Sequence, residues 1–461
     1  MAKIKNMNQQ ERVAYMTTEP IPKLIKEMSV PTIISMLVTN IYNMVDTMFV
    51  GRIDTQATAA VGVSFSIMAL IQAVSFFYGH GSGNYISREL GAKNYDRAER
   101  MAATGFFCAM VTGILLSILG VIFVEPISIL LGSTDTILPY TVSYLRIIFI
   151  GAPFTMGSFV LNNHLRFQGS ASVAMIGVVS GAVLNMVLDP IMIFGMGLGV
   201  AGAALATILS QMLSFCLLLF LDLTRAAVKV NLKKITLNGY YLKNIVKGGL
   251  PSLFRQGIGS VATVVLNTSA KFYGGAAADA AIAAMSIVNR IMMFANAALL
   301  GFGQGFQPIC GTNYGAGKYR RVKEAFNFCV KVGSLVFACI SVLGFVFARP
   351  LIAFFRDDIL VIQIGTVALR AQWAAATLTV YVNMATMLLQ TIGMTWRASI
   401  VTLSRQGFFF IPIVLILPAK IGLTGIQIAQ ALADVCAFLL TVPICTKVLR
   451  DLDAKAAAEA G

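Results

Sequence analysis

The chain has 461 residues, of which 57% are hydrophobic and only 12% are charged. Soluble domains of average composition contain about 25% charged residues, so this chain has too few charges to cover a water-exposed surface, and a soluble multidomain enzyme is excluded. Lys and Arg number 35 against 20 Asp and Glu, which gives a formal net charge of +15. The meaning of this basic excess depends on where the cations lie.

Long apolar segments account for the hydrophobic composition. A helix needs about 20 mostly apolar residues to cross the hydrocarbon core of a bilayer, and uncharged runs of that kind recur along the chain. We therefore predict an all-α polytopic membrane protein, because a spanning barrel would have short alternating segments instead. The twelve predicted transmembrane helices cover residues 28–50, 56–86, 98–124, 138–165, 170–193, 197–222, 242–272, 278–310, 322–347, 359–391, 395–417 and 422–449. The polar segment 1–27 is not expected to be a cleavable secretory signal.

The lysines and arginines are distributed unequally between the two sides of the membrane when the loops that join twelve helices are assigned alternately to one side and the other. Most of them lie in the two termini and the even-numbered loops, among them Arg88, Arg166 and Lys234. The opposite side has Arg52, Arg349, Arg356 and Lys420. By the positive-inside rule, this asymmetry predicts a multi-pass protein of the plasma membrane with both termini in the cytoplasm. The basic excess is thus attributed to topology, and no nucleic-acid partner is expected.

The second half of the chain repeats the first. The segment Gly79-His-Gly-Ser-Gly83 recurs as Gly301-Phe-Gly-Gln-Gly305, and further matches at nearly the same offset are Pro31 with Pro251, Gly91 with Gly315, and Gly199 with Gly422. Because six helices per half is an even number, both halves insert in the same orientation, as two pseudo-symmetric six-helix lobes with a central cleft between them. The predicted organisation is a cytoplasmic N-terminal segment (1–27), an N-terminal lobe (28–225), a cytoplasmic linker (226–241), a C-terminal lobe (242–449) and a cytoplasmic tail (450–461).

Motifs that would indicate other functions lack the context they need. Both G-x-G-x-G runs fall in membrane helices, whereas the dinucleotide-binding motif follows a strand, so close helix packing is their expected role. The seven cysteines are scattered without metal-ligand spacing and are interpreted as packing residues. The sequence also lacks a P-loop, a His/Glu cluster and a usefully spaced Ser–His pair. We expect neither an enzyme activity nor a cofactor.

Acidic residues inside the predicted spans are few, and they are functional candidates because a buried charge in a membrane is costly. Asp46 in the first helix and Asp189 in the fifth are expected at a matching depth in the outer third of the membrane. Asn40, Asn43 and Asp46 share one helix face, as do Asn185 and Asp189. Two carboxylates with amides at one depth predict a site for H⁺ or for Na⁺, with Asp46, Asn185 and Asp189 as the Na⁺ ligands.

Two further interpretations of these acids remain open. Each acid could instead pair with a buried arginine such as Arg146, as a structural element. Asp434 in the twelfth helix stands alone, and its counterpart in the first half lies close to Gln211. A coupling function is therefore predicted for the pair Asp46 and Asp189, and a structural one is favoured for Asp434.

The central cleft is expected to have polar residues from both lobes. Arg255 and Gln256 follow Pro251 closely in the seventh helix and face the cleft in this prediction. The residues predicted to line the cleft are Asn40, Asn43, Arg255, Gln256 and Asn289. His80 and His164 are expected near cytoplasmic helix ends, in ordinary polar roles.

Several segments together resemble the multidrug and toxic compound extrusion (MATE) family. They are Asn43-Met-Val-Asp-Thr-Met-Phe-Val-Gly51, Leu184-Asn-Met-Val-Leu-Asp-Pro190, Gly199-Val-Ala-Gly-Ala-Ala-Leu-Ala-Thr207 and the duplicated Gly-Ala-x-x-Tyr loops. The resemblance covers the whole chain and implies a monomer that exports small amphipathic, often cationic drugs in exchange for H⁺ or Na⁺. It also implies that the coupling residues are Asp46, Tyr144, Asn185, Asp189 and Thr207.

The sequence departs from part of the family in its second half. Some members have acidic residues in helices seven and ten that bind Na⁺, but here helix seven reads Pro251-Ser-Leu-Phe-Arg-Gln-Gly-Ile-Gly259 and the interior of helix ten has no acid. Coupling is therefore expected in the N-terminal lobe. The alternative function is a flippase for lipid-linked saccharides, a related architecture whose cleft would contain several cations; here Arg255 is the main candidate.

Overall fold

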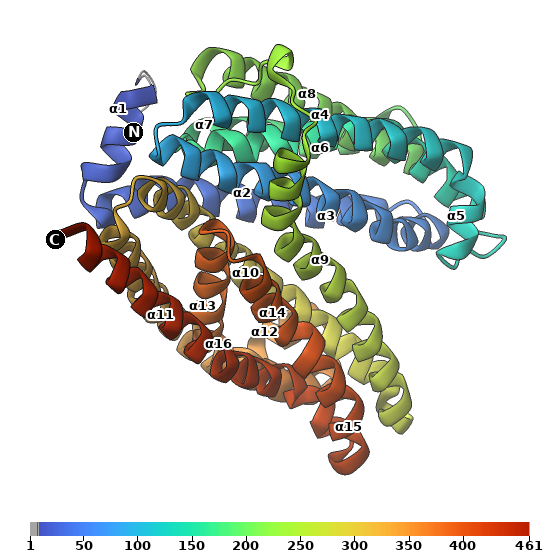
Figure 1. The fold of residues 1–461 in the computed structure, drawn as a ribbon. Helices are drawn as coiled ribbons and strands as arrows, with labels where there is room; N and C mark the ends of the chain where they lie inside the picture. The colour runs from blue at the N-terminus through green and yellow to red at the C-terminus, as the bar shows by residue number, and fades with distance from the viewer. Residues whose placement is uncertain (1–6, 8, 461) are drawn as a thin grey trace.

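The computed structural model describes residue 7 and residues 9–460, and this part of the chain consists of helices joined by turns and loops, without strands. Figure 1 shows two helical bundles that meet near both chain termini and diverge toward α5 in one bundle and α15 in the other. The first bundle is the N-terminal lobe and the second is the C-terminal lobe. Lys3 and Lys5, which the topology prediction used, lie outside the described residues.

A short helix, α1 (Gln9–Thr18), precedes the first predicted span. The N-terminal lobe follows it and contains α2 (Ile21–Val50), α3 (Thr55–Gly91), α4 (Tyr95–Ile122), α5 (Val124–Leu130), α6 (Leu138–Phe167), α7 (Ala171–Pro190), the π-helical turn η2 (Ile191–Gly195) and α8 (Gly199–Arg225).

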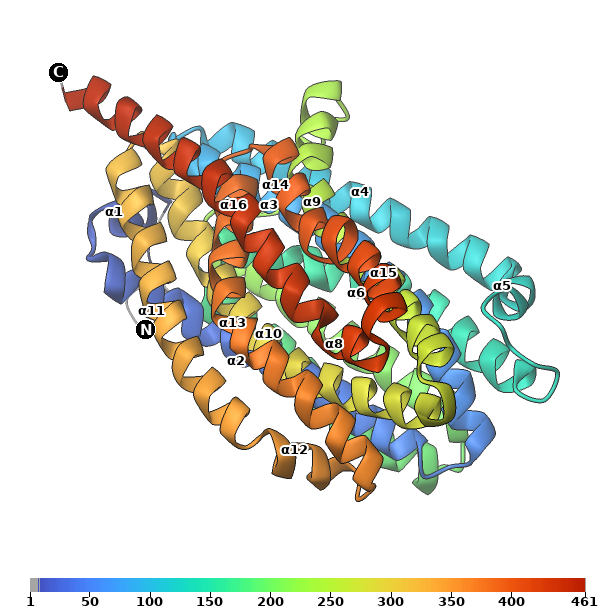
Figure 2. The ribbon, with the colours of Figure 1, turned by 90° about the horizontal axis from the view of Figure 1, so that it is seen from below.

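The C-terminal lobe repeats this order after a connecting segment that contains one 3-10 turn, η3 (Leu232–Lys234). The elements of the lobe are α9 (Gly239–Tyr273), η4 (Gly275–Ala277), α10 (Ala278–Gly315), α11 (Tyr319–Val346), α12 (Ala348–Phe355), α13 (Ile359–Thr391), α14 (Thr395–Leu403), the π-helical turn η5 (Ser404–Phe410), α15 (Ile411–Ile421) and α16 (Leu423–Ala460). Figure 2 shows α16 crossing this lobe, with its last turns extending toward the side of α1.

The predicted helices are found in order. Eleven are long and apolar enough to cross a membrane within the described residues. The remaining predicted helix, the seventh in order, is α9, which has 35 residues and is more polar because it contains Arg255, Gln256 and Lys271. Several ends differ from the predictions: α3 and α10 continue to Gly91 and Gly315. Their last turns are polar yet largely buried between the lobes, so hydropathy alone placed these ends too early.

The repeated glycines allow the two lobes to pack closely. Helix α3 of the N-terminal lobe packs along α9, and α2 packs along α10, so the two interfaces are equivalent under the pseudo-symmetry. A Cβ atom at Gly248 of α9 would lie 2.8 Å from the carbonyl oxygen of Gly81 in α3. One at Gly301 of α10 would lie 2.6 Å from the Cα atom of Ile33 in α2. The packing role predicted for the G-x-G-x-G runs is thus found, and it joins the lobes.

Helix α1 connects both lobes on the side of the molecule that carries the termini. The Arg12 guanidinium donates hydrogen bonds to Ser170 Oγ and to the carbonyl oxygen of Arg225, both in the N-terminal lobe. From the C-terminal lobe, Asn313 Nδ2 donates to the Met16 carbonyl over 3.1 Å, and Lys318 Nζ donates to the Thr17 carbonyl over 3.0 Å. Burial lowers the pKa of Arg12 to about 10.

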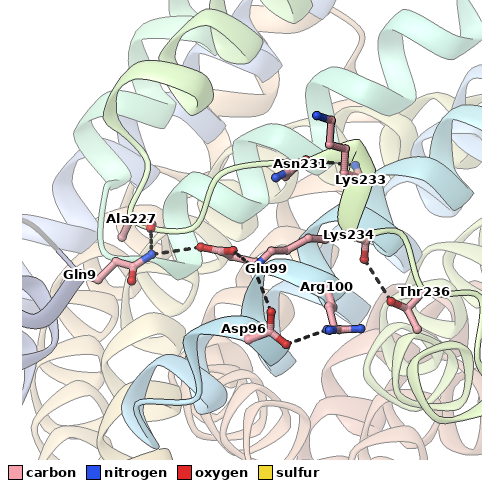
Figure 3. Close-up of polar contacts among 9 residues, drawn as sticks. All are labelled: Gln9, Asp96, Glu99, Arg100, Ala227, Asn231, Lys233, Lys234 and Thr236. Carbon is pink, nitrogen blue, oxygen red and sulfur yellow. Dashed lines mark hydrogen bonds and ion pairs between the residues drawn. The ribbon is translucent and has the colours of Figure 1, made fainter.

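The segment between the lobes is bonded to the N-terminal lobe. The Gln168 side chain forms two hydrogen bonds with the backbone of Val228, of 2.7 and 2.9 Å. Figure 3 shows the adjoining contacts, in which Lys234 reaches Glu99 over 2.6 Å and Asp96 over 2.9 Å. These two ion pairs raise the pKa of Lys234, and the hydrogen bond that Lys234 donates to Glu99 contributes most. The connection is therefore an ordered part of the N-terminal lobe.

Candidate functional site

The two acids predicted to form a site lie in the N-terminal lobe on neighbouring helices. Asp46 is in the last turns of α2, and Asp189 is at the end of α7, directly before Pro190 and the π-helical turn η2. Helices α2 and α7 pack against each other. Asp46 is 8% exposed and Asp189 is fully buried. The carboxylates are close enough to interact electrostatically, so α2 and α7 bring together the two acids that the sequence singled out.

The site contains oxygen atoms that lack hydrogen-bond donors. Asn185 Nδ2 donates to Asp189 Oδ1 over 3.2 Å, one helical turn apart. Asp46 Oδ1, Asn185 Oδ1 and Asp189 Oδ2 are buried and have no hydrogen-bond partner among the described residues. An amide oxygen and ionised carboxylates can only accept, and an unsatisfied buried acceptor is costly. A proton on one carboxyl group or a small cation between the three oxygens would remove this cost.

Tyrosines surround the acid pair. Tyr144 of α6 is fully buried and donates its hydroxyl to Met68 Sδ over 3.4 Å. Tyr144 and Tyr42 both interact electrostatically with Asp46 and Asp189. Tyr42 was not among the predicted residues, although its position four residues before Asp46 on α2 places it on the same helix face. Tyr42 extends the site toward α8 through a hydrogen bond to Gln211.

The other predicted residues occupy a range of positions. Thr207 is buried in α8, which packs against α7. Asn40 and Asn43 are half-buried on α2, Arg255 and Gln256 are half-buried on α9, and Asn289 is exposed on α10. These five candidate cleft residues thus come from both lobes and keep some accessible surface. A cavity of about 330 Å³ lies elsewhere, between Ile53, Tyr140, Ser143 and the turn at Gly197–Gly199.

The structural alternative for the acids applies to one of them only. Arg146 is exposed on α6, and no ion pair joins Asp46 or Asp189 to a cation in the described chain. Asp434 does have such a partner, because Arg405 Nε lies 2.6 Å from its Oδ1. Gln430 Nε2 donates to the same oxygen over 2.9 Å. Asp434 thus has the buried arginine partner that the structural alternative requires.

One predicted cytoplasmic cation is buried between the lobes. Arg166 was expected in a loop but is 1% exposed at the end of α6. Its guanidinium donates to the Gln304 carbonyl over 2.7 Å and to Gln307 Oε1 over 3.2 Å, both in α10. The loop prediction was wrong because a charge near a helix end resembles a loop residue when its partners, distant in sequence, are unknown.

The two histidines are buried in the same region. His80 Nδ1 lies 2.8 Å from Ser252 Oγ of α9, so this contact crosses between the lobes. His164 Nε2 lies 2.7 Å from Ser82 Oγ of α3. Both histidines therefore have the ordinary polar roles expected of them, although they lie inside the molecule and not at accessible helix ends.

The fold, with two pseudo-symmetric six-helix lobes, is an architecture of membrane transporters. The MatE family model matches residues 31–191 and 257–416, one segment in each lobe. The chain therefore belongs to the MatE family, which consists of transporters and not of enzymes.

Individual relatives match over nearly the whole chain. The Multidrug export protein MepA of Staphylococcus aureus (strain NCTC 8325 / PS 47) is 29% identical over 437 residues, which cover 93% of this chain and 95% of that protein. MepA of Staphylococcus haemolyticus (strain JCSC1435) is 28% identical over 432 residues, covering 93% and 94%.

Solved structures have the same fold. A structure described as the outward-facing conformation of a multidrug resistance MATE family transporter has a TM-score of 0.90 and 25% identity, and the match covers 96% of this chain and 98% of that one. A crystal structure of MATE in complex with MaL6 also has a TM-score of 0.90 and 25% identity, with coverage of 95% and 99%.

Proposed function

We propose that this protein exports amphipathic, often cationic organic compounds from the cell in exchange for H⁺ or Na⁺. The observation that carries the coupling assignment is the group of three buried oxygens without donors, on Asp46, Asn185 and Asp189. Tyr144 and Thr207 complete the proposed coupling site. Membership of the MatE family and the multidrug export proteins among its relatives support the substrate class. The substrates bind in the cleft, with Asn40, Asn43, Arg255, Gln256 and Asn289 as the candidate polar contacts.

The protein is proposed to act as a monomer in the plasma membrane, with both termini in the cytoplasm. The cation asymmetry of the loops supports this orientation. The lobes meet on the side that carries the termini, which is the cytoplasmic side in the proposed orientation.

Helix α2 is the proposed link between the cation site and the lobe interface. It carries Asp46 near one end, while near the other Thr32 Oγ1 donates to the Gly301 carbonyl of α10 over 2.6 Å. Pro31, next to Thr32, lacks the backbone N–H that would bond to the preceding turn of α2, and it permits bending at the lobe interface. When H⁺ or Na⁺ neutralises the acid pair, α2 repacks, and the changed interface favours release of the substrate and closure of the outer side. The ion thus acts through its different affinity for two conformations.

Transport into proteoliposomes tests the proposal directly. Ethidium movement should follow an imposed pH gradient if H⁺ is the coupling ion, and an imposed Na⁺ gradient if Na⁺ is. Asp46→Asn should abolish the gradient-driven movement while the protein remains folded, because an amide cannot exchange a cation. Asp453→Asn is the matched control, since this exposed residue only forms a surface ion pair with Lys323. Gradient-driven transport at the wild-type rate by Asp46→Asn would refute the coupling assignment.

The flippase alternative is not favoured. Its cleft would need several free cations, but Arg166 is bonded at the lobe interface and Arg405 is paired with Asp434. The relatives are multidrug export proteins.

A further inference from the structure

The C-terminal lobe contains a buried ion pair within its membrane helices. Arg405 belongs to the π-helical turn η5, and Asp434 lies in α16. Arg405 Nε is 2.6 Å from Asp434 Oδ1, and its Nη2 is 3.5 Å from Oδ2, so the guanidinium faces both carboxylate oxygens. The side chains are 19% and 4% exposed. Among the ion pairs of the described chain, it is the one that joins two spans through a buried carboxylate.

The surroundings of Asp434 repeat the chemistry of the N-terminal site. Gln430 donates its amide to the carboxylate four residues later, over 2.9 Å. Asn185 donates in the same way to Asp189, over 3.2 Å. Both lobes thus contain an amide and a carboxylate one helical turn apart, in a buried position. They differ in the remaining carboxylate oxygen: Asp189 Oδ2 has no partner, whereas Asp434 Oδ2 faces the guanidinium.

The two sites lie on corresponding helices of the repeat. The fifth helix of each lobe contains a π-helical turn, η2 after Pro190 and η5 at Ser404–Phe410, although η5 lies earlier in its helix than η2 does. In the sixth helix, Asp434 corresponds closely to Gln211, which is hydrogen-bonded to Tyr42 beside the N-terminal acid pair. The fifth and sixth helices therefore form a polar site in both lobes, with the acid on the fifth in one and on the sixth in the other.

We propose that Asp434 and Gln430 form a second cation site, which Arg405 occupies permanently as a tethered cation, so that coupling ions exchange only in the N-terminal lobe. A guanidinium remains protonated under all physiological conditions, and its side chain cannot diffuse away. The restriction of cation exchange to the N-terminal lobe rests on the proposed function. The site itself is defined by the contacts of Asp434 alone.

Removal of Arg405 should convert this fixed site into an exchangeable one. Arg405→Gln leaves the carboxylate of Asp434 buried without a counter-cation, so the folded protein should take up H⁺ or Na⁺ there. Among the titratable groups, Tyr381 of α13 also contacts α16, where its ring lies 5.5 Å from that of Phe438 and its hydroxyl is hydrogen-bonded to Cys445. These groups lie further along α16 than Asp434 and contribute equally to all the variants compared below.

The experiment measures thermal unfolding of the purified full-length protein in detergent. Melting temperatures are recorded from pH 5 to pH 8 and with NaCl replacing choline chloride at constant ionic strength. All variants also carry Asp46→Asn, which removes one carboxylate of the N-terminal pair and leaves the same remaining response of that site in every variant. The Arg405→Gln variant should gain a new dependence on the ions: its melting temperature should rise as the pH falls or as Na⁺ is added. A ligand that binds only the folded state stabilises that state. Arg405→Gln/Asp434→Asn should lose this gain.

The controls distinguish the outcomes. Arg405→Lys retains a tethered cation and should show no such gain. A folded Arg405→Gln whose melting temperature is no more sensitive to pH or Na⁺ than that of Arg405→Gln/Asp434→Asn would overturn the proposal.

A second measurement covers the case in which Arg405→Gln fails to fold. With Asp46 intact, Arg405→Gln/Asp434→Asn exchanges the ion pair for two amides, a replacement that proteins commonly tolerate. Its melting temperature should respond to Na⁺ and pH as that of the wild type does, because neither removed group exchanges an ion. A weaker response of the melting temperature to Na⁺ and pH, at unchanged stability, would assign ion exchange to Asp434 and overturn the proposal. Failure of Asp46→Asn to affect transport would refute only the coupling assignment.

Discussion

At the residue scale, Arg166 shows how a single buried cation holds two lobes together without a carboxylate. Besides its bonds to α10, Arg166 Nη2 donates to Asn163 Oδ1 over 2.5 Å. The guanidinium carbon lies 4.4 Å from the centroid of the Phe167 ring. Carbonyl and amide oxygens together with an aromatic face can solvate a guanidinium, whose charge is delocalised and weakly hydrated. Arg166 is therefore a bridge between α6 and α10.

We predict that Arg166→Gln destabilises the protein by about 3 kcal/mol, because hydrogen bonds to a charged group are worth about 1.5–3 kcal/mol each and the shorter side chain leaves acceptors in α10 unsatisfied. The measurement is a thermal or denaturant melt in detergent. Arg97→Gln is the control, since Arg97 is exposed on α4 and should change stability little. Equal stabilities for the two variants would contradict the bridging role.

At the scale of elements, α1 has few of the properties that sequence patterns detect, yet it connects both lobes. Its apolar positions are few, and the C-terminal lobe donates hydrogen bonds to the backbone carbonyls at its end. Arg321 donates to the carbonyl of Glu19, just after α1, in addition to the bonds from Asn313 and Lys318. The free carbonyls at a helix C-terminus carry partial negative charge and attract cations. The C-terminal lobe thus binds the end of α1 electrostatically.

We predict that Lys318→Ala/Arg321→Ala loosens closure on the side of the termini. In a chain whose seven native cysteines are replaced by alanine, a cysteine introduced at Ser252, buried between α3 and α9, should react faster with a water-soluble maleimide when the double substitution is present. Lys323→Ala is the control, because Lys323 pairs with Asp453 on α16 and does not contact α1. Unchanged labelling in the double variant would show that α1 does not help to close this side.

The sequence sufficed for those elements whose determinants are local. Apolar runs located the spans, and the i, i+4 spacing of Asn185 and Asp189 predicted a contact that the structure has. The structure also places Asp46 near Asp189, because α2 and α7 pack together. The pairing of Asp434 with Arg405, 29 residues away in the chain, depends on how η5 and α16 pack. The same limitation applies to the polar ends of α3 and α10, whose burial results from contacts between lobes.

At the scale of the whole molecule, the lobes are joined by backbone-to-backbone contact at glycines. The interfaces of α3 with α9 and of α2 with α10 are equivalent in the repeat. A larger side chain in place of a glycine would force either pair of helices apart. Such contacts have no flexible side chains to rearrange, so the two lobes can meet closely or separate, but they have few intermediate ways to pack. This property suits a protein that alternates between two states.

We predict that Gly248→Ala destabilises the closed interface, because the added Cβ would lie 2.8 Å from the Gly81 carbonyl oxygen and force α9 away from α3. A lower melting temperature is the expected result. Gly257→Ala on the same helix is the matched control: its Cβ would have no neighbour within 4 Å, and alanine favours a helix over glycine by up to about 1 kcal/mol. Stabilisation by both substitutions would contradict the close-packing role.

The bonding of the connecting segment to the N-terminal lobe determines where the chain can pivot. The Thr236 backbone is still held by Thr104, whose Oγ1 accepts from the Thr236 amide over 3.0 Å. The first turn of α9 is anchored as well, because Asn238 caps it and the Tyr240 hydroxyl receives a hydrogen bond of 3.2 Å from Tyr85. Both anchors belong to the N-terminal lobe, so the chain stays attached to that lobe into the first turn of α9. Rotation of one lobe against the other must therefore be accommodated beyond Tyr240, within helix α9 and not in the extended connection before it.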